Sequence, residues 1–172
     1  MTRTICLHGP ESVGKSVLAA ALAGRFGAAL VGEYGRDYCE AHGTDLGMAD
    51  LVEIARVQTS LIAEAKARAE WVIADTDALM TAVWADMMLG TRDPWFDAFD
   101  DAADLYLLLD IDLPFVDDGL RLYGGAAERA CFFDLCRDEL ERRGVPWALV
   151  TGLGEARLDS ALTAIRRHFN LA

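Results

Sequence analysis

Short apolar segments of strand length alternate with longer segments of helical periodicity along this chain. The short, largely apolar segments are residues 4–8, 28–31, 71–74, 105–109 and 147–150. Apolar residues recur at helical spacing over about 15–26, 50–70 and 78–90, in a segment that ends near residue 143, and in an amphipathic segment at the end of the chain. Strands that alternate with helices predict an α/β fold, with a mostly parallel five-stranded sheet and helices on both faces.

Polar residues follow directly after each predicted strand. In open parallel sheets, ligands bind in the crevice beyond the carboxyl ends of the strands. The segments that would line one such crevice are residues 9–16, 33–38, 75–77, 110–121 and 152–154.

The first of these segments, GPESVGKS, matches G-x-x-x-x-G-K-[ST], the loop that cradles phosphates. It lies between a predicted strand and an Ala/Leu-rich helix, whose positive N-terminal end favours an anion. In this motif Lys15 supplies a charge for the outer phosphates, and the hydroxyl of Ser16 serves magnesium. We therefore expect ATP to contact Gly9, Pro10, Glu11, Ser12, Val13, Gly14, Lys15, Ser16 and Val17.

Composition limits the other classes of partner. The 172 residues are most simply one domain, and a net charge of −12 argues against nucleic acid as the main partner. No apolar run approaches the roughly 20 residues of a membrane span, and the first strand starts too early for a signal peptide, so we expect a cytoplasmic protein. The four cysteines and three histidines show no zinc-binding spacing.

A small-molecule kinase is the phosphate-loop class that fits the remaining residues. The only asparagine is Asn170, so the N-K-x-D guanine reader of GTPases is missing, and the protein-kinase motifs are missing as well. Phosphoryl transfer needs magnesium, cationic donors and a carboxylate near the acceptor hydroxyl. Glu33 and Asp75 are the candidate carboxylates: we assign Glu33 to the acceptor and Asp75 to magnesium, although the two could exchange roles.

The glycine-rich, charged segment after residue 110 is the candidate lid. Arg121 and Arg129 either fold over the phosphates or form surface ion pairs with Asp117, Asp118 or Glu128. After the last strand, Gly152 either lets the backbone approach adenine or forms a simple turn.

The candidate residues on the acceptor side each have a structural alternative. Arg36 reaches the acceptor or pairs with a neighbouring carboxylate, and Tyr34 and Tyr38 face the base or belong to the core. Gln58 is the polar residue that interrupts the apolar stripe of its helix, and Asp77 holds ribose hydroxyls or caps the next helix. The complete acceptor set is Glu33, Tyr34, Arg36, Tyr38, Gln58, Asp77 and Asp118, while Trp84 and Trp95 are expected to pack in the core.

Taken together, these motifs resemble the ribosylnicotinamide (nicotinamide riboside) kinase domain of the bifunctional bacterial NAD-biosynthesis regulator family. The resemblance rests on GPESVGKS, EYGRDY, Gln58, DTD, DIDLPFVDDGLR and Arg129, in the same order over essentially the whole chain. It implies a three-layer P-loop kinase fold with a lid over about 115–130. It also implies ATP-dependent phosphorylation of the 5′-hydroxyl of nicotinamide riboside to nicotinamide mononucleotide.

The chain departs from the family pattern at three points. Gly32 stands where a tryptophan often precedes Glu-Tyr-Gly-Arg to stack on the nicotinamide ring, and Phe115 stands where tryptophan is common. The DNA-binding segment and the adenylyltransferase domain are absent, so we expect the kinase module alone. Two alternatives stay open: a kinase for another nucleoside or a nucleoside monophosphate, and a nucleotide-binding regulatory ATPase.

Overall fold

Five strands form one parallel sheet at the centre of the protein, whose computed structural model describes residues 2–171. Their order is β2-β3-β1-β4-β5, and every neighbouring pair is parallel, which confirms the predicted α/β fold. The strands are β1 (Arg3–His8), β2 (Ala29–Val31), β3 (Trp71–Asp75), β4 (Leu105–Leu109) and β5 (Trp147–Val150).

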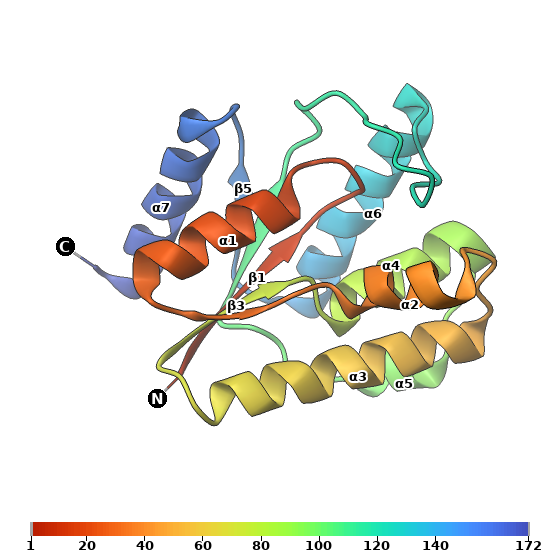
Figure 1. Cartoon of the computed structure of the whole chain (residues 1–172), viewed down its shortest axis with the longest axis horizontal. Helices are drawn as coiled ribbons and strands as arrows, with labels where there is room; N and C mark the ends of the chain where they lie inside the picture. Colours follow the sequence, from red (N-terminus) through yellow and green to blue (C-terminus); the bar gives the residue numbers. More distant parts are fainter. Residues whose placement is uncertain (1, 172) are drawn as a thin grey trace.

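Helices cover both faces of this sheet (Figure 1). One face packs against α1 and α7, and the other packs against α4, α6 and the end of α3. The helices of the described residues are α1 (Lys15–Phe26), α2 (Tyr34–His42), α3 (Met48–Lys66), α4 (Ala78–Leu89), α5 (Pro94–Ala98), α6 (Ala126–Arg143) and α7 (Glu155–Phe169).

The central strand β1 shows why this layering follows from the sequence. Successive side chains of a strand point to opposite faces. Ile5 and Leu7 are fully buried in the core beneath α1 and α7, whereas Cys6 is fully buried in the core beneath α4 and α6. Because both faces are covered, the strand is apolar without alternation.

Two helices were not predicted from the sequence. Helix α2 has only nine residues, most of them polar, and contains a glycine, so it was not recognised as a helix. Helix α5 has only five residues, too few for a periodic pattern. The other helices match their expected segments, except that α3 ends at Lys66 rather than near residue 70.

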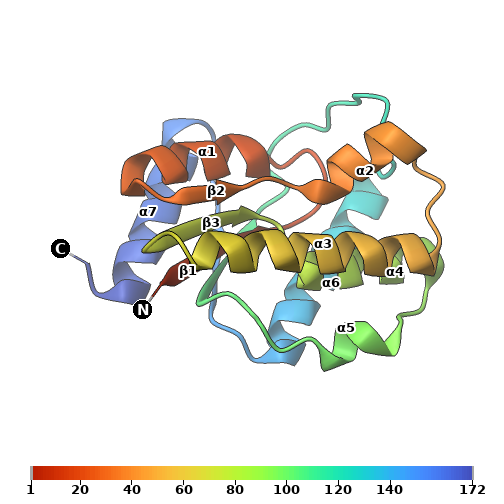
Figure 2. The same cartoon turned by 60° about the horizontal axis from the view of Figure 1, so that its bottom comes forward.

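Residues 110–125 form an irregular segment between β4 and α6, here called the lid segment. Figure 2 shows it arching from beside α1 to α2. The backbone N–H of Val116 donates to Ser12 Oγ at 2.8 Å, and the N–H of Leu122 donates to Glu11 Oε2 at 3.0 Å. These hydrogen bonds connect the lid segment to the phosphate loop. The lid was expected over about residues 115–130, and the end of that range belongs to the first turn of α6.

Asp77 caps α4, which is one of the two alternatives foreseen for it, and it does not line the cavity. Its carboxylate accepts hydrogen bonds from the backbone N–H groups of Leu79 (3.0 Å) and Met80 (3.4 Å) and from the hydroxyl of Tyr106. The side chain is buried in these contacts, so no oxygen is left to face a ligand.

We expect Asp77→Ala to lower the free energy of unfolding by about 2–3 kcal/mol, because it removes the cap and strands a buried hydroxyl. Asp93→Ala is the matched control, since Asp93 caps the short α5 by accepting from Trp95 N at 2.8 Å. Its loss should cost at most about 1 kcal/mol. Urea unfolding followed by circular dichroism measures both. If Asp77→Ala were as stable as the wild type, the capping role would be contradicted and Asp77 would again be a candidate ligand of the acceptor.

Candidate active site

The phosphate loop has the backbone that its glycines allow. Gly9 and Gly14 have φ angles of 138° and 82°, and a Cβ on Gly9 would lie 3.1 Å from the carbonyl oxygen of Leu109. Gly14 precedes α1 without a side-chain cap, and the first turn of α1 has no acidic residue. The N–H groups at the start of α1 therefore remain for an anion.

Lys15 lies at the mouth of this loop. Its ammonium donates to the carbonyl oxygens of Gly9 at 2.9 Å and Pro10 at 2.6 Å, so the side chain curls over its own loop. These are contacts that an incoming phosphate can replace, since phosphate oxygens make charge-assisted hydrogen bonds with an ammonium.

Asp75 and Ser16 form the pair that fits magnesium. Ser16 Oγ donates to Asp75 Oδ2 at 2.5 Å, and the buried Asp75 Oδ1 has no hydrogen-bond partner. Hydroxyl and carboxylate oxygens are the ligands that Mg²⁺ prefers. Within residues 2–171, no cluster of three His, Cys, Asp or Glu side chains could hold a metal alone. A magnesium ion here would take its other ligands from phosphates and water.

Glu33 faces the same cavity as Lys15 and Ser16. It is the residue before α2, at the end of β2, and its half-buried carboxylate accepts no hydrogen bond within the described residues. Burial raises the pKa of Glu33 above that of an ordinary glutamate, with the charge of Lys15 opposing the shift. A carboxylate with a raised pKa in a cleft is suited to accept a proton.

Two predicted site residues pair with Asp118 of the lid segment. Arg36 Nη1 lies 3.0 Å from Asp118 Oδ2, and Arg121 Nε lies 3.3 Å from the same oxygen. The Arg36 guanidinium holds the pKa of Asp118 below its usual value. The ion-pair alternative foreseen for Arg121 is thus present, whereas Arg36 pairs across the cavity and not with a neighbour on α2. Asp118 itself is engaged by both arginines.

Arg129 differs from the other arginines of this region. It lies in the first turn of α6, is only 9% exposed, and its Nε and Nη2 atoms have no hydrogen-bond partner. Burial lowers the pKa of this guanidinium. No ion pair of the expected kind forms at Arg129 within the described chain, so an unpaired cation stands at the base of the lid segment.

Gln58 lines the cavity, as expected for an acceptor residue, and it also organises the backbone around it. Its amide donates to the carbonyl oxygens of Gly32 (3.0 Å) and Thr76 (3.2 Å) and accepts from Tyr34 N (2.9 Å). These contacts join the loops after β2 and β3. They also hold Thr76 at a φ of 76°, a rare angle for a β-branched residue.

The two tyrosines, unlike Gln58, do not line the cavity. Tyr38 is buried, its hydroxyl donates to Asp50 Oδ1 at 2.7 Å, and its ring stacks on His42. Tyr34 packs edge-on against Tyr38. The core alternative therefore holds for Tyr38, and neither ring lines the cavity.

Gly152 belongs to a tight turn beside a buried arginine that the sequence did not reveal. Arg157 is 4% exposed and donates to the carbonyl oxygens of Gly152 at 2.7 Å and Val13 at 2.5 Å. It also pairs with Asp112, which accepts from Gly152 N at 2.7 Å. The loop after β5 is thereby fixed to the phosphate loop, and Gly152 does not line the cavity.

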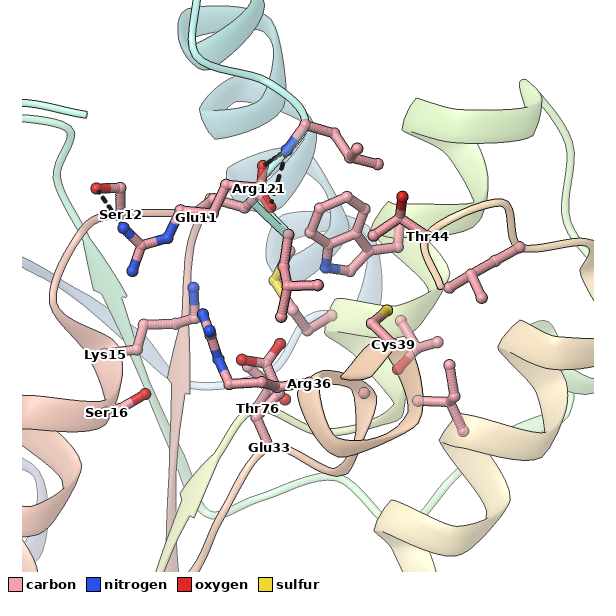
Figure 3. Close-up of a pocket in the computed structure, with 18 of the residues that line it drawn as sticks. Glu11, Ser12, Lys15, Ser16, Glu33, Arg36, Cys39, Thr44, Thr76 and Arg121 are labelled. Atoms are coloured by element: carbon pink, nitrogen blue, oxygen red, sulfur yellow. Dashed lines mark hydrogen bonds between the residues drawn. The ribbon is translucent and has the colours of Figure 1, made fainter. Parts of the chain in front are cut away.

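The cavity has a polar end and an apolar end (Figure 3). Lys15 and Ser16 lie on one side, and Cys39 and Thr44 lie on the other. The apolar wall comes from α3 and α4 and was not foreseen. Its main residues are Leu51, Ile54, Met80, Trp84 and Met88. The spacing of the last three, four residues apart on α4, was the available signal.

A protein-family profile described as "AAA domain" matches residues 4–157. The chain belongs to this family. It is also 34% identical over 155 residues to the "Trifunctional NAD biosynthesis/regulator protein NadR" of Escherichia coli (strain K12). That match covers 86% of this chain but only 38% of the relative. It confirms the resemblance that the motifs indicated.

Solved structures of related fold include P-loop kinases. A "NadR protein in complex with NR" aligns with a TM-score of 0.84 and 24% identity, covering 99% of this chain and 52% of that one. A thymidylate kinase from Ehrlichia chaffeensis aligns with a TM-score of 0.70 and 13% identity, covering 96% and 98%. This AAA-family chain therefore has the P-loop kinase fold. Within residues 2–171, no helix has the length and apolar character to span a membrane.

We expect Asp75→Asn to weaken magnesium-dependent nucleotide binding about tenfold, because an amide is a poorer ligand and a poorer partner for Ser16. Calorimetric titration with an ATP analogue, with and without magnesium, measures the effect. Binding without magnesium should not weaken. Asp101→Asn is the control, since Asp101 pairs with Lys66 on the surface. Equal losses with and without magnesium would contradict the assignment of Asp75.

Proposed function

We propose that this chain is an ATP-dependent kinase that phosphorylates the 5′-hydroxyl of nicotinamide riboside to give nicotinamide mononucleotide. The observation that carries the proposal is the single cavity. It joins the phosphate loop and Glu33 to an apolar wall formed by α3 and α4. A phosphate loop alone would equally suit a hydrolase, but a hydrolase has no use for such a wall.

The phosphate loop binds the donor in this proposal. The N–H groups at the start of α1 hold the phosphates, and Lys15 leaves the carbonyl oxygens of Gly9 and Pro10 to reach the outer ones. Ser16 and Asp75 would hold magnesium, which when bound neutralises charge on the phosphates. Arg121 reaches the same cavity from the lid segment and adds positive charge there.

Glu33 acts on the acceptor. Its carboxylate takes the proton of the 5′-hydroxyl as the oxygen bonds to the γ-phosphorus and the bond to the bridging oxygen of ADP breaks. Its raised pKa makes its carboxylate a stronger base than that of an exposed glutamate. The carboxylates and cations thus supply positioning and charge stabilisation, which are the main needs of phosphoryl transfer.

The relatives support the choice of acceptor. The Escherichia coli relative is named for NAD biosynthesis, and a NadR protein of the same fold was solved in complex with NR. The second candidate is a kinase for another nucleoside or a nucleoside monophosphate, since a thymidylate kinase and a deoxyadenosine kinase from M. mycoides share the fold. A regulatory ATPase fits less well, because it needs neither Glu33 nor the apolar wall.

We expect Glu33→Gln to lower turnover by about 10²-fold or more and to leave ATP affinity unchanged, because it removes the base and no phosphate contact. The wild type should lose turnover as pH falls through a pKa above the ordinary glutamate value, since the ionised form is the active one. Glu33→Gln should lose this acidic limb. If the variant changes only the magnesium requirement, the roles of Glu33 and Asp75 are exchanged.

A coupled ADP-release assay tests the proposed acceptor. Nicotinamide riboside should show a higher kcat/KM than adenosine, cytidine, uridine, thymidine or their 5′-monophosphates. Omission of the acceptor gives the background of hydrolysis. A clear preference for another nucleoside or a monophosphate would replace nicotinamide riboside as the substrate. If the rate of ADP release did not depend on any acceptor, the proposed kinase activity itself would be contradicted.

A further inference from the structure

The apolar end of the cavity is formed partly by α4. Thr76 lies beside Glu33 in Figure 3, and α4 begins two residues after Thr76. Along α4, Met80 and Trp84 face the cavity on one stripe. With a rise of about 1.5 Å per residue, Trp84 lies roughly 6 Å further along the helix than Met80. A nucleoside with its 5′-hydroxyl at Glu33 therefore extends its base toward Trp84.

Contacts with two other aromatic rings hold Trp84 in place. Its ring meets Phe132 edge-on with centroids 4.7 Å apart, and it lies 5.9 Å from the ring of Tyr123. The side chain is only partly buried, it lines the cavity, and the indole N–H donates no hydrogen bond within residues 2–171. The ring is thus a fixed aromatic surface with one open side, and this side faces the cavity.

The lid segment connects this surface to the phosphate loop. The backbone N–H of Tyr123 donates to Glu11 Oε2 at 3.1 Å, and Glu11 is part of the phosphate loop. Tyr123 therefore contacts Trp84 with its ring while its backbone is bound to the loop that holds the donor. The lid segment supports Trp84 in the same arrangement that places Arg121 at the cavity.

No other aromatic side chain of the described residues competes for this role. Trp71, Trp95 and Trp147 do not line the cavity. Gly32, where relatives of this family often carry tryptophan, is exposed, and a Cβ there would meet nothing within 4 Å. The aromatic surface is therefore inside the cavity on α4, and not at position 32.

We propose that Trp84 stacks on the base of the acceptor nucleoside and gives this chain its preference for a planar, positively charged base. The inference rests on the proposed kinase function and deepens it. A cationic ring such as a pyridinium gains a cation–π contact with tryptophan that a neutral base does not gain.

Fluorescence gives a direct test, because a pyridinium ring quenches tryptophan emission on contact. The chain has four tryptophans. Titration of the full chain with nicotinamide riboside should quench part of the emission, and Trp84→Phe should abolish that part. Trp71→Phe is the matched control and should keep it, since Trp71 packs against Phe26 and Phe169, away from the cavity. Quenching that persists in Trp84→Phe would overturn the inference.

Kinetics give the second test. Trp84→Leu should raise KM for nicotinamide riboside about tenfold with kcat within about twofold, and Trp84→Phe should raise it only about two- to threefold. KM for ATP should not change in either variant. The preference for nicotinamide riboside over uridine should fall about fivefold or more in Trp84→Leu. Because Trp84→Phe keeps an aromatic ring in the core, it remains informative if Trp84→Leu does not fold.

The two proposals fail in different ways. If the wild type phosphorylates nicotinamide riboside and Trp84→Leu keeps its KM and selectivity, Trp84 is only a packing residue and the kinase stands. If the wild type prefers another nucleoside, the proposed substrate fails, while a rise in KM for that nucleoside in Trp84→Leu still supports stacking. If no nucleoside quenches the fluorescence of Trp84 and none is phosphorylated, both proposals are wrong.

Discussion

The parallel direction of all five strands is the constraint on which the rest of the structure depends. Because the carboxyl ends of the strands meet at one edge, every residue that follows a strand is delivered to the same place. The register makes this concrete. Leu7 pairs with Asp75, so the carboxylate at the end of β3 lies beside the start of the phosphate loop, where it meets Ser16. The apolar strands therefore decide the geometry of a polar site.

Several charged groups around this edge are arranged in pairs. Arg36 and Arg121 both pair with Asp118, and Glu11 accepts hydrogen bonds from the lid backbone. Among the buried polar atoms without a partner in the described residues are Asp75 Oδ1 and two nitrogens of Arg129. Buried polar atoms without partners carry a desolvation cost that structures rarely keep without reason. In the proposed kinase, magnesium and the donor phosphates are the partners that these two groups lack.

The sequence was sufficient for the sheet and the phosphate loop, because both follow from local patterns. Buried strands appear as apolar runs, and the loop is a contiguous motif with glycines at positions that require positive φ. Glu33 and Asp75 could be placed for the same reason, since Asp75 ends β3 and Glu33 lies two residues after β2. Helix α2 was missed because it is short, largely polar and contains a glycine.

Roles that depend on long-range contacts could not be derived in this way. Gln58 was identified as unusual, but only the fold shows that its partners are backbone groups 18 to 26 residues away. Arg157 donates to the carbonyl oxygen of Val13, which is 144 residues away, and no pattern near Arg157 in the sequence predicts this contact. Trp84 was assigned to the core because a tryptophan on an apolar helix usually packs there. It does pack there, and its other side lines the cavity.

The central claim is that the γ-phosphoryl group moves to a nucleoside and not to water. The most direct measurement uses ATP labelled in its γ-phosphate, nicotinamide riboside in excess, and separation of the labelled nucleotide from inorganic phosphate. We expect most of the label in the 5′-monophosphate, with Lys15→Ala reducing its formation by about 10²-fold or more. Label found only in inorganic phosphate, at a rate unaffected by nucleosides, would contradict the account and indicate a nucleotide hydrolase.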